Sequence, residues 1–97
     1  MSIGNYSNGS TTVASTPTLI CTVDPDSAGV LLQNTGSAAI FVGGPNVTTS
    51  GAYTGISLTN TNSPVTFFPS TGGVQHGIYG VVATGTQTIS WLYVQAP

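Results

Sequence analysis

Residues 29–42 have the sequence GVLLQNTGSAAIFV, and this stretch decides the fold. Two runs rich in Val, Leu, Ile and Phe flank the turn sequence Asn34-Thr35-Gly36-Ser37, in which Gly36 is able to take a positive φ. The stretch therefore predicts an antiparallel hairpin, with one strand over residues 29–33 and the other over residues 39–42.

Similar short runs continue on both sides of this hairpin. Residues 18–23 predict a strand with Leu19, Cys21 and Val23 on one face, and the Asp-Pro-Asp-Ser sequence at residues 24–27 ends it as a turn. The other expected strands cover residues 65–68, 78–83 and 88–94, short edge segments cover residues 47–48 and 56–58, and loops cover residues 43–55 and 70–77.

No run has the spacing of an amphipathic helix, and Thr, Val and Ile dominate the regular segments. The sequence predicts an all-β fold, which we expect to be a single antiparallel β-sandwich or small barrel of about seven to eight strands. Residues 1–12 are small and polar without a sustained period, so they predict a flexible N-terminal arm. The β-sandwich domain is then expected to span residues 13–97.

Charged residues are almost absent from this chain of 97 residues. It has no Lys or Arg and two acids, Asp24 and Asp26, so its formal net charge is −2. Binding to nucleic acid or to an anionic membrane draws on Lys and Arg, and we therefore expect neither partner. The start of the sequence has no signal-peptide pattern, and no apolar run approaches the roughly 20 residues of a membrane span. The single cysteine, Cys21, fits synthesis in a reducing cytoplasm.

Few residues are able to carry chemistry. His76 is the only histidine and Cys21 the only cysteine, and no local motif pairs either with a base or an orienting acid. We expect a buried, inert Cys21 thiol and no enzymatic activity; catalysis through His76 is the alternative. Asp24 and Asp26 are expected to cap a turn, with weak cation binding as the alternative. No metal site and no cofactor are predicted.

Several strands carry apolar residues at consecutive positions, so both of their faces are hydrophobic. An ordinary apolar surface is one explanation, and cover by neighbouring subunits is the other. The second is favoured because no Lys protects the strand edges against pairing. We expect a homo-oligomer in which Ile40, Phe41, Trp91 and Tyr93 lie at the interface.

Three segments in a fixed order carry a resemblance. They are GVLLQNTG at residues 29–36, IFVGG at 40–44 and IYGVVATGT at 78–86, followed by ISWL at 89–92. This order resembles small virion proteins of tailed bacteriophages, most closely capsid decoration (cement, head-stabilising) proteins, over residues 29 to 94.

The resemblance implies a non-catalytic β-sandwich, commonly a homotrimer, on the outer capsid surface of the virion. There it would bridge subunits of the major capsid protein and stabilise the head. On this hypothesis the N-terminal arm, with Ile3 and Tyr6, docks on the capsid. The alternative is a receptor- or glycan-binding module of a head fibre or minor tail protein, in which Tyr53 stacks on a sugar.

Overall fold

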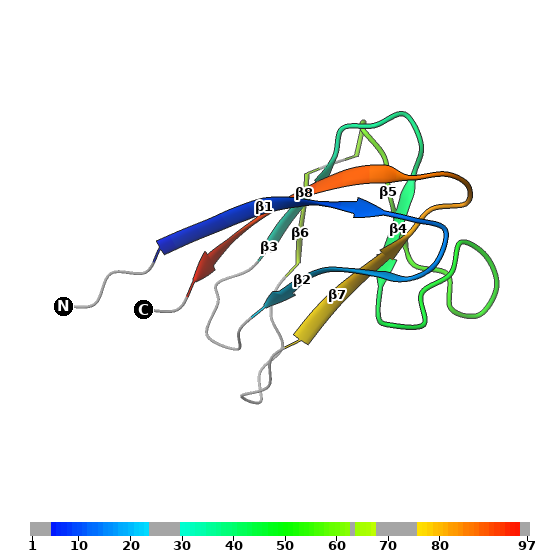
Figure 1. Ribbon diagram of the computed structural model, residues 1–97, viewed down its shortest axis with the longest axis horizontal. Helices are drawn as coiled ribbons and strands as arrows, with labels where there is room; N and C mark the ends of the chain where they lie inside the picture. Colours follow the sequence, from blue (N-terminus) through cyan, green and yellow to red (C-terminus); the bar gives the residue numbers. More distant parts are fainter. Residues whose placement is uncertain (1–4, 24–29, 63, 68–75, 96–97) are drawn as a thin grey trace.

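Eight strands and no helix are present in residues 5–23, 30–62, 64–67 and 76–95, which the computed structural model describes (Figure 1). For residues 5, 6, 23, 65–67, 76 and 93–95 it describes the backbone alone. The strands are β1 (Asn5–Val13), β2 (Thr18–Val23), β3 (Val30–Asn34), β4 (Ile40–Gly43), β5 (Ile56–Leu58), β6 (Val65–Phe67), β7 (His76–Val81) and β8 (Gln87–Gln95). The predicted all-β class is confirmed. The described part of the chain holds no helix long and apolar enough to cross a membrane.

Two four-stranded antiparallel sheets form the molecule. The strand order is β1-β8-β3-β6 in the first, called sheet A, and β2-β7-β4-β5 in the second, called sheet B. The predicted pairing of residues 29–33 with residues 39–42 in a hairpin is therefore wrong: β3 and β4 lie in different sheets, and the turn between them carries the chain from one sheet to the other. Both sheets are open, so of the two predicted architectures the sandwich is observed and the closed barrel is not. Figure 1 shows the start of β1 beside the end of β8, in agreement with the pairing of Asn5 with Gln95.

The core lies between the sheets and follows from the two-residue period of the strands. In β3 and β4 the first and third residues point inward and are buried, while the residues between them face out of the sandwich. Residues from both sheets form one buried cluster: Val13, Ile20, Cys21, Val30, Leu32, Ile40, Val42, Leu58, Val82 and Ile89. The sequence therefore buries a continuous apolar core between the two sheets.

A β-bulge in β2 changes the predicted face of this strand. The pairing with β7 shifts between Leu19 and Cys21, so Ile20 is an extra residue in the ladder. Ile20 and Cys21 are both buried, whereas Leu19 is 44% exposed. The prediction that Leu19 and Cys21 share a face is therefore wrong, because the bulge resets the alternation between them. The Thr11 hydroxyl donates a 3.0 Å hydrogen bond to the carbonyl of Ile20 and joins β1 to the bulge.

Strand β1 corrects the expectation of a flexible arm over residues 1–12. Residues 5–13 pair with β8 along their full length, from Asn5 opposite Gln95 to Val13 opposite Gln87. A Cβ atom on Gly9 would lie 2.7 Å from the ring of Trp91, so only glycine allows this close approach. The sandwich domain thus extends back to Asn5 at least, beyond the expected start at residue 13, and residues 1–4 lie outside the described part.

Asn34 ends β3 and is buried, although the sequence suggested only a turn position. Its side-chain amide donates to the carbonyls of Ala38 (2.7 Å) and Leu58 (2.9 Å), and its Oδ1 accepts from the Gly36 N–H (2.9 Å). One side chain therefore fixes the turn after β3 and ties it to the end of β5. Only 1% of Asn34 is exposed, so water cannot replace these bonds.

Candidate interaction surfaces

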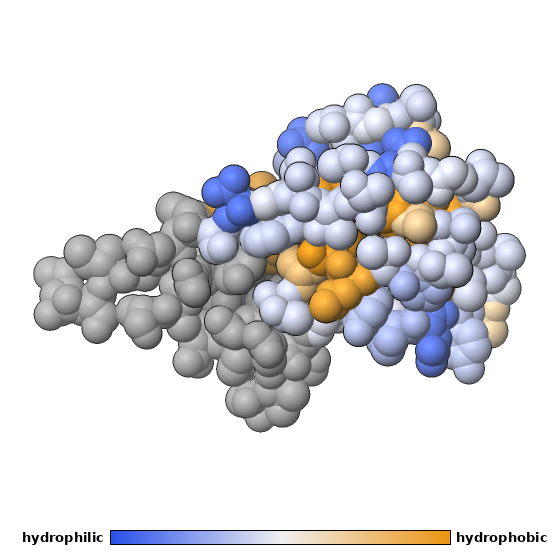
Figure 2. Space-filling model, viewed as in Figure 1, coloured by the Kyte–Doolittle hydropathy of each residue, from blue (hydrophilic) through white to orange (hydrophobic). Residues whose placement is uncertain are grey.

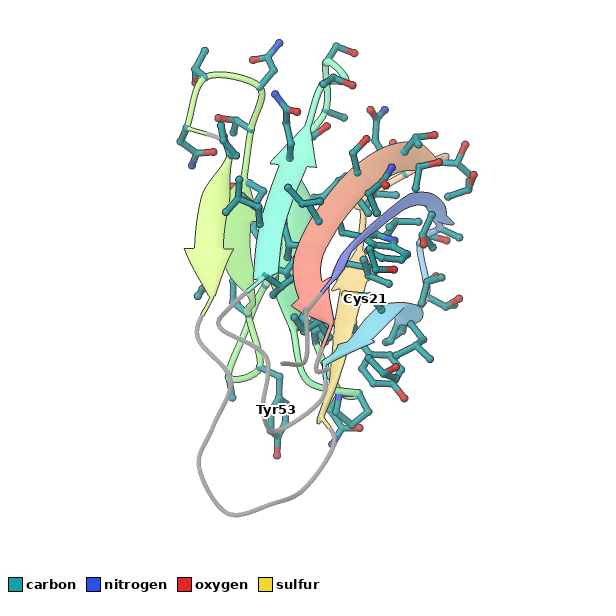
Figure 3. All side chains as sticks on the ribbon, turned by 90° about the vertical axis from the view of Figure 1, so that its left-hand side faces the viewer. Cys21 and Tyr53 are labelled. Atoms are coloured by element: carbon teal, nitrogen blue, oxygen red, sulfur yellow. The ribbon has the colours of Figure 1, made fainter. Side chains whose placement is uncertain are left out.

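The residues considered for catalysis or metal binding do not come together in the described part of the chain. No group of three His, Cys, Asp or Glu side chains is found there. His76 was expected in a loop, but its backbone begins β7 and pairs with Val23; its side chain lies outside the description. Asp24 and Asp26 also lie outside the described residues. Cys21 lies inside the sandwich (Figure 3), and burial raises the pKa of its thiol to about 11.

Alkylation of Cys21 by iodoacetamide at pH 8 is expected to be at least about 100-fold slower in the folded protein than in urea. A pKa of about 11 leaves roughly one thiol in a thousand ionised at pH 8, and only the thiolate reacts. Because the folded pKa lies above that of the unfolded thiol, stability from this group is lost between about pH 9 and 11. Mass spectrometry measures the extent of labelling over time. Equal rates in the folded protein and in urea would contradict an inert thiol.

The outer face of sheet A carries an exposed pair of leucines. Leu31 on β3 and Leu92 on β8 are register partners, and 38% and 36% of their surfaces are exposed. Asn8 on β1 lies beside Leu92 in the same row, and Ser90 and Gln33 are paired in a neighbouring row. These residues line a shallow groove of about 590 Å³ in which every lining residue is uncharged.

The outer face of sheet B carries a second apolar area. Leu19 on β2 is paired with Tyr79 on β7, and both side chains lie over Gly77. Because Leu19 is exposed by the bulge and Gly77 has no side chain, the apolar surface reaches solvent here. Figure 2 shows hydrophobic residues at the surface over β2 and β7, surrounded by more polar ones. The two apolar areas lie on opposite outer faces of the sandwich.

The residues that the sequence assigned to an interface do not lie together on one surface. Ile40 is fully buried in the core, so its assignment to an interface is wrong: it occupies an inward position of β4. Phe41 is half-buried on the outer face opposite Val81, and Trp91 packs against the core. Tyr93 and Tyr6 are described by their backbones in β8 and β1, and Ile3 lies outside the described residues.

Leu19, Leu31 and Leu92 were missed as surface residues because apolar runs do not reveal which member faces outward. They could have been identified from the alternation of each strand, once a buried residue fixes which positions point inward. In VLLQN the buried Asn34 and Leu32 set the phase of β3 and leave Leu31 on the outside. In β8 the buried Ile89 does the same for Leu92.

Tyr53 is held at the end of an ordered loop between β4 and β5. The Tyr53 carbonyl accepts a 2.9 Å hydrogen bond from the Thr48 N–H, and the Gly55 N–H donates to the Thr48 carbonyl at 3.0 Å. Gly51 takes a φ of +90° between them, and Val47 is buried beneath the loop. Figure 3 shows Tyr53 beyond the ends of the strands, and 66% of it is exposed, as the sequence suggested.

A hollow of about 440 Å³ lies beside this tyrosine. Its lining includes Asn46, Thr54 and Ile56 and contains no charged residue. Tyr53 and Asn46 are both exposed to solvent, so a ligand in the hollow can reach their side chains. The arrangement combines an exposed ring with uncharged polar groups, which suits stacking and neutral hydrogen bonding rather than the binding of an ion.

Comparisons with protein-family models, with curated proteins and with solved structures find no match to this chain.

Proposed function

We propose that this chain is a non-enzymatic structural protein of a tailed-bacteriophage virion that decorates the outer capsid surface and stabilises the head. The observation that carries the proposal is the pair of separate apolar areas, around Leu31 and Leu92 on sheet A and around Leu19 on sheet B. A decoration protein needs two kinds of contact, one with its own copies and one with the major capsid protein. Two unpartnered areas on opposite faces supply both.

The charge of the chain supports the same role. Without any Lys or Arg it has no means to neutralise DNA phosphates, which suits a place on the outside of the shell, away from the packaged genome. With a net charge of only −2, copies repel one another weakly and pack side by side at high local density. The segment order that resembles decoration proteins adds to this argument.

Quantitative mass spectrometry of purified virions tests the proposal through the number of copies of this chain per particle. Decoration of the head requires copies in the hundreds, in proportion to the major capsid protein. A handful of copies would contradict decoration and place the chain in a tail or a fibre. Labelling of intact particles with an antibody distinguishes an outer location from an inner one.

Tyr53 and its hollow favour a second candidate function, the binding of a neutral sugar by a receptor-binding module. A tyrosine ring stacks on the apolar face of a sugar, while the amide of Asn46 is placed to bond hydroxyl groups. Acidic sugars are disfavoured, because no cation is present to pair with their carboxylates.

On a glycan array we expect Tyr53→Ala to abolish binding to neutral glycans and Tyr53→Phe to keep most of it. Phenylalanine retains the ring that stacks and loses only the hydroxyl, so it is the matched control. Sialylated glycans are expected to give no signal with any variant. Signals that are the same for wild type and Tyr53→Ala would exclude this candidate, and so would a complete lack of signal with wild type.

A further inference from the structure

We propose that Asn8-Gly9 in β1 is a site of spontaneous deamidation which pairing with β8 suppresses, so that the reaction occurs only when β1 separates from β8 at this position. In this reaction the main-chain nitrogen of Gly9 attacks Cγ of Asn8. The proton of that nitrogen leaves with the side-chain amide group as ammonia, and a succinimide ring forms. Addition of water then opens the ring to an aspartate or to an isoaspartate.

The sequence favours this asparagine over the others. Asn8 is the only asparagine of the chain that is followed by glycine. A side chain on the following residue hinders the approach of its nitrogen to the amide, and glycine has none. Asn46, by comparison, precedes Val47, whose branched side chain hinders the same approach. Both asparagines are exposed, so water reaches either amide. Asn8 is therefore the reactive one of the two once its backbone is free to rotate.

The position of Asn8 within β1 prevents ring closure in the folded protein. Asn8 is paired with Leu92 and Gly9 with Trp91, so both residues have extended backbone in an antiparallel ladder. An extended residue has a ψ of about +135°, which turns the nitrogen of the next residue away from the side-chain amide. Ring closure requires rotation about the Cα–C bond of Asn8, and this rotation breaks the ladder beside it. Pairing with β8 therefore protects Asn8.

β1 is also placed so that this protection can be lost locally. The strand lies at the edge of sheet A. Among residues 7–13, whose side chains the structure describes, only Val13 is buried. The hydrogen bond from Thr11 to the carbonyl of Ile20 provides a second attachment. Asn8 lies on the N-terminal side of both, so residues 5–9 are able to separate from β8 while Val13 stays in the core.

The two products differ in their effect on β1. Aspartate leaves the main chain unaltered and adds a negative charge beside Leu92, in a groove that no charged residue lines. Isoaspartate carries the main chain through the side chain and adds one carbon atom between residues 8 and 9. Asn5–Ser7 and Gly9–Val13 then cannot both keep their register with β8. Isoaspartate therefore prevents β1 from pairing again along its whole length.

Mass spectrometry of the full chain, incubated at mildly alkaline pH with and without guanidinium chloride, tests the inference. Digestion with chymotrypsin locates the modified residue, since the chain has no Lys or Arg for trypsin. Conversion of Asn8 is expected to be at least about 10-fold faster in the denaturant. Asn46 is the internal control and should keep its amide over the same period. Asn8→Gln keeps an uncharged amide but needs a larger ring, so it should show no conversion at residue 8.

Three results would overturn the inference. They are equal rates of Asn8 conversion in the folded and the denatured protein, no conversion of Asn8 in the denaturant, and conversion of Asn46 as fast as that of Asn8. The fluorescence of Trp91 after removal of the denaturant tests the effect of the two products. The aspartate form and the variant Asn8→Asp are expected to recover the signal of wild type, whereas the isoaspartate form is not. Recovery by the isoaspartate form would contradict its predicted effect on β1.

Discussion

Removal of residues 2–12 is expected to abolish cooperative folding. The deletion takes away all of β1 except Val13, and with it nearly the whole ladder that pairs β1 with β8. It uncovers one side of Trp91, which packs over Gly9, and removes the hydrogen bond from Thr11 to the carbonyl of Ile20. A sheet of three strands with an exposed apolar edge does not compensate for these losses, because the stability of a small domain is only about 5–15 kcal/mol.

Urea denaturation followed by the fluorescence of the single tryptophan, Trp91, measures this effect. The control variant Ser10→Ala/Thr12→Ala changes two exposed side chains of β1 and keeps its backbone, so it should unfold cooperatively. If the truncated chain gave the same transition as wild type, β1 would not be part of the folded domain. In that case the hypothesis that residues 2–12 dock on a capsid would be the one to test.

Replacement of Asn34 by alanine is expected to lower the free energy of unfolding by about 3 kcal/mol. Alanine leaves the carbonyls of Ala38 and Leu58 and the N–H of Gly36 without the partner that Asn34 provides. Asn34→Asp is expected to be at least as damaging at neutral pH. The aspartate keeps the shape of the side chain but has no N–H to donate, and it places a negative charge against two carbonyl oxygens.

Asn62→Ala is the matched control for this buried asparagine. Asn62 also accepts from a backbone N–H, that of Thr59 at 2.6 Å, and donates to a carbonyl, that of Ser57 at 2.9 Å, but it is exposed. Water replaces both bonds when it is removed, so we expect a loss below about 1 kcal/mol. Similar losses for Asn34→Ala and Asn62→Ala would show that burial adds nothing to the role of Asn34.

The sequence was sufficient to predict the bounds of the strands that contain runs of hydrophobic residues. Residues 18–23 form β2 with the predicted bounds, and the strands expected at residues 29–33 and 39–42 are observed within one residue of each end. Strand β1 was missed because Asn-Tyr-Ser-Asn-Gly-Ser-Thr-Thr has no apolar alternation. It is a strand because β8 provides hydrogen-bonding partners along its whole length, and such a tertiary effect is not encoded in local propensity.

The surfaces were harder to predict than the strands. That both faces of some strands are apolar was visible in Val30-Leu31-Leu32, but which leucine faces solvent depends on the phase of the strand in the sheet. The bulge at Ile20 shows the same limit, because one additional residue in the ladder turns Leu19 outward. Its position in a loop was enough to predict that Tyr53 is exposed, since a tyrosine among Gly, Ala and Thr has little to pack against.

The pairing of β1 with β8 has a consequence for how the protein is made. β1 emerges first from the ribosome among the described strands and β8 emerges last, so each residue of β1 is separated from its partner by about three quarters of the sequence or more. Until β8 is synthesised, β1 has no strand to pair with and β3 lacks one of its two neighbours. Sheet A is therefore completed only once β8 has been synthesised, in the slow regime of folds with distant contacts. Chains that terminate before β8 cannot build it.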